Sequence, residues 1–191
     1  MGDVSMKSAA VDAPFPLTDV DKWVLSLTDE EFTYHDWEDL KKIISDNNLS
    51  VLKRKPSDLR RYMKWTARIK TDKYYLFRVP FGDTSDYCVL KNDWPYGLTD
   101  DITHIVVWSR TVIETDPVNG DMTPESRQTV AEFIERFFVD RLGPEGHKRV
   151  LWFKNWVALQ SVRTLEHIHV MVKDASDGLI EEFTRELECH A

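Results

Sequence analysis

The sequence contains only two cysteines, Cys88 and Cys189, and they lie far apart in the chain. Neither has the neighbours that a cysteine-based zinc site needs, and two cysteines do not make the disulfide framework of a small secreted domain. We therefore expect both thiols to be reduced, and the cytoplasm is the predicted location.

Long hydrophobic runs and positive charge are also scarce. No apolar run approaches the roughly 18 residues that a membrane-spanning helix needs, and residues 1–16 lack the apolar centre of a secretory signal. The 25 Lys and Arg residues against 33 Asp and Glu residues give a net charge of −8, whereas binding along nucleic-acid phosphates needs a basic face. The short basic stretches at 53–55 and 60–61 are interpreted as solvated helix faces. Neither a membrane nor a nucleic-acid polymer is predicted as a partner.

Hydrophobic residues are plentiful, at 42% of the 191 residues, and aromatic residues make up 12%, with 7 Trp among them. This composition is sufficient for one domain with a packed core. We expect residues 1–17, rich in small residues and proline, to be a disordered leader and residues 18–191 to form a single domain. Its parts would be a helical cover over 18–80, a core of sheet and helix over 86–174, and a C-terminal helix over 178–191.

Capping residues and apolar spacing predict the helices. A helix start is predicted at 28–31, a second helix over about 35–44 and a third over 56–69. The segment 123–125, Thr-Pro-Glu, opens a long helix with a cap, a proline at the first helical position and an acid in the first turn. A short helix is predicted around 179–187.

Short β-prone runs predict four strands, at 87–90, 103–108, 150–153 and 166–172. Along the chain, helices are followed by two strands, a long helix, two more strands and a final helix. This order predicts an α+β fold, in which an antiparallel sheet carries the long helix across one face.

The last predicted strand carries His167 and His169, the strongest candidates for chemistry in the chain. Alternation along a strand places both imidazoles on one face, where they can share a pocket, and turns Ile168, Val170 and Val172 to the other face. Histidine can transfer protons or act as a nucleophile near neutral pH. The alternative is a pair of structural histidines that are hydrogen-bonded within the core.

Further polar and aromatic residues can complete a pocket around the two histidines. Asn155 follows the third strand, and we expect its amide within about 8 Å of one imidazole, where it can orient the ring. The predicted substrate-binding residues are Trp94, Tyr96, His104, Arg110, Trp152, Lys154, Gln160 and Ser161. Turn residues, a polar loop and core aromatics are the alternative interpretations of these positions.

A divalent metal bound by His104, His167 and His169 is an alternative use of these histidines, because His-x-His is a common pair of metal ligands. It lacks a carboxylate on the matching face, because alternation turns Glu166 to the other side. We therefore predict neither a metal nor a cofactor.

The order of the motifs is informative. It runs through Asn92-x-x-Pro95-Tyr96, His104-x-x-Val107-x-x-Arg110, the Thr-Pro-Glu helix start, Asn155, Gln160-Ser161-Val162 and His167-x-His169-Val-Met-Val. This order resembles the histidine triad (HIT) superfamily over residues 86–174. In that superfamily the Asn, the Ser and three alternating histidines surround the phosphate of a nucleotide or nucleotide-like substrate. The closing segment, 152–170, more specifically resembles the fungal N-acetylglucosamine-induced protein 1 family, a similarity that extends over most of the chain from about Leu27.

Only two of the three histidines of the triad are present. One register places Leu165 at the first position, His167 at the central, nucleophilic position and His169 at the third. The other register makes His169 central and Met171 third. We favour the first register because 160–162, Gln-Ser-Val, then aligns after only one inserted residue.

The resemblance implies an enzyme that hydrolyses or transfers a phosphoester or nucleotide-like group through His167. His169 and Asn155 would fix the tautomer of His167, and Ser161 would donate to the developing negative charge. A second hypothesis is a fungal small-molecule biosynthetic enzyme that uses the histidine pair for acid–base chemistry on a non-phosphorylated metabolite. A third is a catalytically silent binding protein. All three imply a small-molecule partner, with a homodimer as one candidate assembly.

Overall fold

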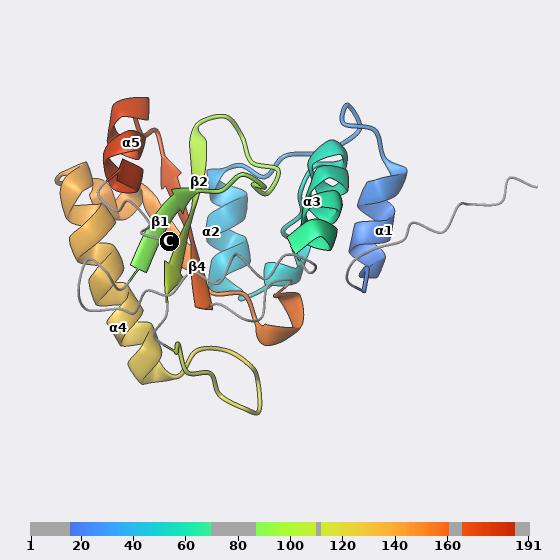
Figure 1. Ribbon diagram of the computed structural model, residues 1–191. Coiled ribbons are helices and arrows are strands. Elements are labelled where there is room, and N and C mark those ends of the chain that lie inside the picture. The colour runs from blue at the N-terminus through green and yellow to red at the C-terminus, as the bar shows by residue number, and fades with distance from the viewer. Residues whose placement is uncertain (1–15, 70–86, 110–111, 161–165, 186–191) are drawn as a thin grey trace, which may run out of the picture.

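Four strands form one antiparallel sheet at the centre of the molecule (Figure 1). The computed structural model describes residues 16–69, 87–109, 112–160 and 166–185. The strands are β1 (Tyr87–Lys91), β2 (Ile102–Ser109), β3 (Val150–Phe153) and β4 (Glu166–Lys173), in the order β1-β2-β4-β3. All three pairings are antiparallel. The predicted strands and the predicted sheet are therefore confirmed.

Two helices cover one face of the sheet, as Figure 1 shows. Helix α4 (Pro124–Ile134) begins at the predicted place, with Thr123 accepting from the Ser126 N–H, and continues through a π-helical turn (Glu135–Val139). Helix α5 (Asp177–Arg185) packs beside it. The buried core between helices and sheet contains Val89, Ile105, Val107, Val130, Phe133, Phe137, Phe138, Ile168, Val170, Val172, Ile180 and Phe183. The long helix thus lies across one face, as predicted.

The N-terminal helices lie on the opposite side of the sheet (Figure 1). Helix α2 (Trp37–Ser45), capped by Asp36, packs its apolar side chains against the sheet, where Phe153 and Met171 belong to the same buried cluster. Helix α3 (Pro56–Ile69) packs against α1 (Asp19–Ser26) farther from the sheet. Within the described residues 18–69, these helices lie where the helical cover was predicted, and residues 70–80 of that cover lie outside the described residues.

The helix start predicted at Thr28–Glu31 is wrong, because the chain makes only a local loop there. The Thr28 N–H donates to the Glu31 carboxylate and the Glu31 N–H donates to the Thr28 hydroxyl, so the two capping groups satisfy each other without a helix. The unpredicted α1 lies upstream, where Thr18 and Asp21 form a capping box. Of the predicted leader, residues 1–15 lie outside the described residues, and Leu17 packs against the α1–α3 cluster.

Cys88 is buried and disulfide-bonded, so the expectation of a reduced thiol at this position is wrong. The fold explains why distance along the sequence was a poor guide. Helix α5, the last described element of the chain, packs against β1, which carries Cys88. Cys189 lies outside the described residues.

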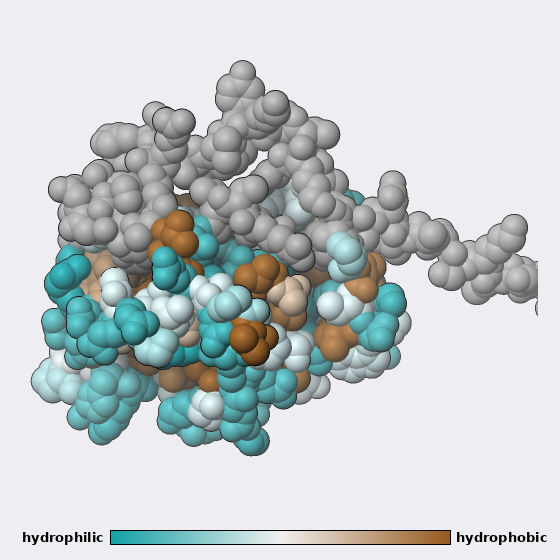
Figure 2. Space-filling model, turned by 90° about the horizontal axis from the view of Figure 1, so that it is seen from below, coloured by the Kyte–Doolittle hydropathy of each residue, from teal (hydrophilic) through white to brown (hydrophobic). Residues whose placement is uncertain are grey.

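On the face shown in Figure 2, hydrophobic and hydrophilic residues are interspersed. Some large hydrophobic side chains are exposed, such as Trp23 and Val118, which is normal for a protein surface. Within the described ranges, no helix combines the length and the hydrophobicity that crossing a membrane would require.

Candidate active site

Strand β4 places its alternate side chains on the two faces of the sheet. Ile168, Val170 and Val172 belong to the core beneath α4, whereas His167 and His169 line a cavity on the opposite face. Both histidines are nearly buried, with 7% and 4% of their surface exposed. The predicted alternation is confirmed, and the histidine face is the one that the N-terminal helices cover.

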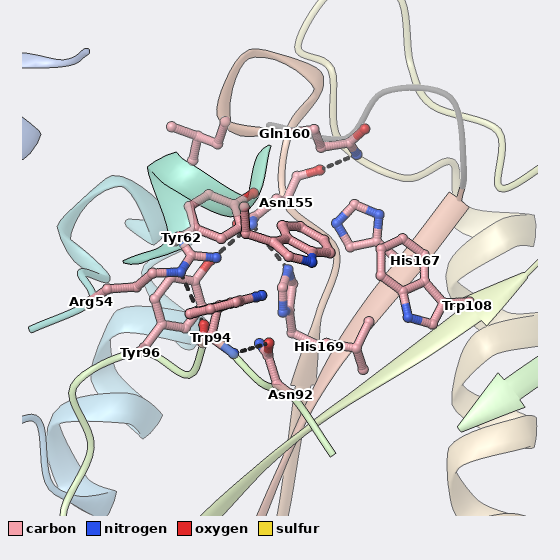
Figure 3. A pocket seen from close by; sticks show the side chains of 13 residues that line it. Arg54, Tyr62, Asn92, Trp94, Tyr96, Trp108, Asn155, Gln160, His167 and His169 are labelled. Atoms are coloured by element: carbon pink, nitrogen blue, oxygen red, sulfur yellow. Dashed lines mark hydrogen bonds between the residues drawn. The ribbon is translucent and has the colours of Figure 1, made fainter. Parts of the chain in front are cut away.

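The cavity beside the two histidines has a volume of about 70 Å³ and lies between the sheet and the N-terminal cover (Figure 3). Its lining side chains are Arg54, Tyr62, Trp65, Asn92, Trp94, Tyr96, Val106, Trp108, Asn155, Leu159, Gln160, His167 and His169. They come from the segment just before α3, α3 itself, the loop after β1, strands β2 and β4, and the loop after β3. The cavity therefore forms only when segments from across the chain are brought together.

Hydrogen bonds connect two histidines to the polar groups around them. The Tyr96 N–H donates to His104 Nδ1 at 3.2 Å, and His104 Nε2 lies 2.9 Å from His169 Nδ1. On the far side of His169, Nε2 lies 3.1 Å from Asn155 Nδ2, which also donates to Tyr96 Oη at 3.0 Å. Asn155 thus lies in direct contact with an imidazole, as expected. Both ring nitrogens of His169 are occupied by protein groups.

Burial lowers the pKa of His104 and of His169 well below the ordinary value of 6.5. For His104, the positive charge of Arg54 lowers the pKa further; for His169, the neighbouring His104 does so. Burial also raises the pKa of Tyr96. The two hydrogen-bonded imidazoles are therefore neutral near pH 7, and His169 is poorly suited to carry a proton during turnover.

His167 has a different environment. Its ring lies 4.9 Å from the Trp108 ring and edge-on to the His169 ring at 5.3 Å. It lines the cavity, whereas the hydrogen bonds from Tyr96 to Asn155 run through His104 and His169. Within the described ranges, no three His, Cys, Asp or Glu side chains are grouped as metal ligands.

The two neutral histidines predict a loss of stability in mild acid. In the unfolded chain each imidazole binds a proton with an ordinary pKa of 6.5, whereas in the folded protein the pKa of His104 and His169 lies well below that value. Below pH 6.5 the unfolded state therefore binds more protons, so the free energy of unfolding decreases as the pH falls. Between about pH 7 and about pH 5.5 the two residues together should remove about 2.5 kcal/mol, measurable by urea denaturation at each pH.

The matched variant for this experiment is His104→Gln, which leaves one of the two buried imidazoles. Its loss of stability over the same pH interval should be roughly half as large, whatever the absolute cost of the substitution. A variant with the full pH dependence of the wild-type chain would show that His104 binds its proton equally well in the folded state.

The structure brings several predicted residues together. Trp94, Tyr96 and Gln160 line the cavity, and the side-chain amide of Gln160 donates to the backbone carbonyl of Asn155 at 2.8 Å. His104 is buried and does not line the cavity itself, but it contacts three residues that do, namely Asn92, Tyr96 and His169. Arg110 and Ser161 lie outside the described residues.

Two further predicted residues, Trp152 and Lys154, do not line the cavity. Trp152 packs against the core beneath α4, because its pairing with Val170 places it on that face of the sheet. Lys154 is buried and forms an ion pair with Glu166, with Nζ 3.2 Å from Oε2. This contact is a charge pair without hydrogen-bond alignment, since that oxygen has no hydrogen-bond partner. Neither residue takes the role in the pocket wall or in anion binding that the sequence suggested.

The N-terminal cover supplies residues that the sequence did not indicate. Arg54, interpreted as part of a solvated basic stretch, lies over the rings of Tyr62 and Tyr96 at 3.9 and 5.4 Å and donates from Nε to the Trp94 carbonyl at 2.9 Å. It forms no ion pair with any residue in the described part of the chain. Trp108 had a readable signal, because it lies four residues after His104 on the same face of β2.

Comparison with known proteins identifies relatives. Residues 36–173 match the family described as "Protein of unknown function (DUF3605)". The chain is 31% identical over 156 residues to N-acetylglucosamine-induced protein 1 of Candida albicans, which covers 74% of this chain and 59% of that protein. It is 28% identical over 155 residues to uncharacterized protein YPL067C of Saccharomyces cerevisiae, which covers 71% of this chain and 77% of that protein.

These matches confirm the similarity to the fungal N-acetylglucosamine-induced protein 1 family, although the chain spans only about 59% of the length of that Candida protein. A solved structure titled "Crystal Structure of HTC1" has a TM-score of 0.61 and 22% sequence identity, covering 83% of this chain and 97% of that one. At this identity the likeness extends to the fold alone.

Proposed function

We propose that this chain, which belongs to the family described as "Protein of unknown function (DUF3605)", is an enzyme. In this proposal His167 transfers protons on a small, planar, negatively charged metabolite. The observation that carries this proposal is the position of His167 on a cavity with aromatic walls and one guanidinium group. Such a site combines a group able to exchange protons, surfaces for a flat ligand and one charge for its orientation.

The walls of the cavity favour a planar ligand. Five aromatic side chains line it: Tyr62, Trp65, Trp94, Tyr96 and Trp108. Flat apolar surfaces of this kind stack with conjugated or aromatic rings. The volume of about 70 Å³ is well below the roughly 300–1,000 Å³ of pockets that enclose drug-sized ligands. It suits a small metabolite, or the reacting end of a larger one, better than a whole nucleotide.

Arg54 supplies the charge. Its guanidinium is held in place by two tyrosine rings and the Trp94 carbonyl, and no carboxylate in the described part of the chain compensates it. A planar donor group of this kind binds a carboxylate or phosphate oxygen well. A ligand with one anionic group would therefore be oriented with that group toward Arg54.

His167 is the better candidate for the proton carrier of the pair. His169 is neutral, and both of its nitrogens contact protein groups. His167 lines the cavity beside Trp108 and can reach a ligand stacked there. General acid–base catalysis by a positioned imidazole needs this proximity first and a suitable pKa second.

The second candidate function is hydrolysis or transfer of a phosphoester on a HIT-like fold. The specific observation in its favour is that His167 and His169 alternate on a strand of an antiparallel sheet, with Asn155 in contact with one of them. His167 would then attack phosphorus and form a covalent phosphohistidine. It ranks second because phosphoryl transfer relies on positive charge around the transferring group. Arg54 is the one cation among the described lining residues, and Lys154 is paired with Glu166.

The proposal predicts which ligands stabilise the folded chain. Small planar carboxylates, such as benzoate and phenylpyruvate, should raise the melting temperature more than adenosine monophosphate or glucose 6-phosphate at equal concentration. A ligand present at about a hundred times its Kd adds about 2.7 kcal/mol to the free energy of unfolding, which thermal denaturation detects readily. Intact-mass analysis after incubation with the nucleotide tests for a phosphohistidine in the same samples.

Arg54→Gln is the variant that tests the charge, and Arg136→Gln, an exposed change on the α4 side, is its matched control. Arg54→Gln should lose the increase in melting temperature that benzoate produces, and Arg136→Gln should keep it. A larger shift with nucleotides, together with a covalent phosphate on His167, would favour the phosphoester function instead. Binding of carboxylates without turnover of any would indicate a binding protein.

A further inference from the structure

The buried amide of Asn155 has one atom without a partner. Asn155 is only 7% exposed, and its Oδ1 accepts no hydrogen bond from the described residues, while Nδ2 faces both Tyr96 and His169. Trp94 Nε1 is likewise buried without a partner. Leaving a buried polar group unpaired is unfavourable, because the group loses its hydrogen bonds to water. Because both residues line the cavity, a bound molecule is the natural source of the missing partners.

One backbone donor fixes the tautomers of the two buried histidines. The Tyr96 N–H donates to His104 Nδ1, so this nitrogen carries a lone pair and the ring proton sits on Nε2. The amide nitrogen of Asn92 lies 3.3 Å from Nδ1 and 3.2 Å from Nε2, so it does not select between the two tautomers. His104 Nε2–H then donates to His169 Nδ1 at 2.9 Å, and the proton of His169 must sit on its own Nε2. A positively charged His169 would point a second N–H at that of His104. The geometry thus requires two neutral rings, in agreement with the lowered pKa of each.

This assignment decides which way the Asn155 amide faces. His169 Nε2–H points at the amide from 3.1 Å, so an amide nitrogen at that place would oppose one donor with another. A half-turn of the amide exchanges its oxygen and nitrogen, which the hydrogen-bond network alone distinguishes. After the exchange, Oδ1 accepts from both His169 Nε2–H and Tyr96 Oη–H, and the opposition of two donors between His169 and Asn155 is removed. The amide N–H then occupies the position that lacked a partner.

We infer that Asn155 directs its side-chain N–H into the cavity, where it and Trp94 Nε1–H bind an acceptor oxygen of the substrate, and that His104 and His169 are positioning residues that hold it there. This inference rests on the proposed function and names its substrate class: a compound with a carbonyl or carboxylate oxygen, and not an amine. No Asp or Glu occurs among the described residues that line the cavity, so the site offers donors to a ligand and little that would accept from an ammonium group. In Figure 3 the Trp94 nitrogen lies on the side of the ring that is turned away from Arg54 and toward the histidines.

The arrangement suits proton abstraction next to a carbonyl group. His167 would take the proton from carbon, the C–H electron pair would form a C=C bond, and the carbonyl oxygen would become an enolate oxygen. The Asn155 N–H would stabilise that developing negative charge, and return of the proton from His167 to carbon or oxygen would complete the step. Donors fixed in advance at the place where charge develops are a major source of catalytic rate. We call the hydrogen-bonded chain from Tyr96 N–H through His104 and His169 to Asn155 the relay. Because both of its imidazoles stay neutral, it keeps the Asn155 donor fixed through the reaction cycle.

The tautomers can be measured without any ligand. Long-range ¹H–¹⁵N correlation spectra of the full, ¹⁵N-labelled chain distinguish the two neutral tautomers of histidine and the charged form. We expect His104 and His169 both to carry their proton on Nε2 between about pH 6 and about pH 8, with His104→Gln and His169→Gln spectra providing the assignments. A proton on Nδ1 of His169, or a charged ring at either position, would overturn the relay.

Asn155→Asp tests the direction of the amide in the cavity. One carboxylate oxygen can still accept from His169 and Tyr96, but the other presents a negative acceptor where the N–H was. We expect a folded protein that binds benzoate at least about tenfold more weakly than the wild-type chain, since a hydrogen bond to a charged group is worth about 1.5–3 kcal/mol. Trp94→Phe, which keeps a ring and removes the second donor, should weaken benzoate binding by a smaller factor.

The outcomes separate this inference from the proposed function. Unchanged benzoate binding by Asn155→Asp would show that the amide N–H does not face the ligand, even if the spectra agree. Tighter binding of benzylamine than of benzoate by the wild-type chain would overturn the substrate class. If the spectra and the Asn155 variant behave as expected but His167 proves dispensable, the acceptor site stands and the proton-transfer function does not.

Discussion

Replacement of His167 by alanine should lower kcat/KM for the substrate by about 10³-fold while leaving the protein folded. The size follows from the loss of a positioned acid–base group, which contributes about 10²–10⁴-fold to a rate. The fold should persist because the His167 ring faces a cavity and contacts Trp108, whereas the main core lies on the other face of β4. Steady-state kinetics, with circular dichroism as the check on folding, measure both effects.

Free imidazole should restore part of the lost rate, because the alanine variant leaves the space of the missing ring open to a cavity of about 70 Å³. His169→Ala is the matched variant. It removes a positioning residue and not the proton carrier, so a residual rate should remain, with a loss of about 2–4 kcal/mol in transition-state stabilisation. A dead His169→Ala beside a merely slow His167→Ala would make His169 the central histidine. Normal turnover in both would show that the pair is structural.

Part of this site could be predicted from the sequence because the signals for it are local. Alternation along β4 is a local property, so the shared face of His167 and His169 followed directly from their spacing. The same holds for the capped start of α4 at Thr123, where the signal lies within a few residues. Local signals of this kind were sufficient to predict the α+β fold and its antiparallel sheet.

The relay could not be read in the same way, because it depends on strand register. The antiparallel pairing of β2 and β4 places Val106 opposite His169, which brings His104 to a diagonal position on the same face. Nothing in the sequence near His104 reveals that register. We predicted that His104 binds the substrate. In the structure it lies next to the cavity and contacts His169, and it does not line the cavity itself.

Packing between distant segments explains the remaining differences. Arg54 looked like part of a solvated basic stretch, and only the docking of the N-terminal cover stacks it on Tyr62 and Tyr96. Trp152 lies in a strand of four apolar residues, where a run without polar positions does not show which face is which. The sequence therefore predicted the half of the cavity built by the sheet better than the half built by the cover.

Phe138→Ala should cost about 3–5 kcal/mol of stability and leave ligand binding unchanged. Phe138 lies in the π-helical turn after α4 and is fully buried in the core on that face of the sheet, with its ring 4.9 Å from Phe137 and 5.0 Å from Phe183. Truncation of a buried Phe removes its transfer free energy and leaves a cavity that neighbours fill only in part. Urea denaturation should show a lower midpoint with an unchanged slope, since the surface exposed on unfolding is nearly the same.

The matched control is Val118→Ala, a change at a side chain that is 93% exposed, for which a difference within about 0.5 kcal/mol is expected. The informative comparison is with the cavity. At a temperature where Phe138→Ala is fully folded, its Kd for benzoate should equal that of the wild-type chain, because β4 presents Ile168 and Val170 to Phe138's side and His167 to the other. Weaker binding by the folded variant would mean that packing under the sheet sets the position of the histidines. The site would then depend on both layers of the fold and not on the cover and the sheet surface alone.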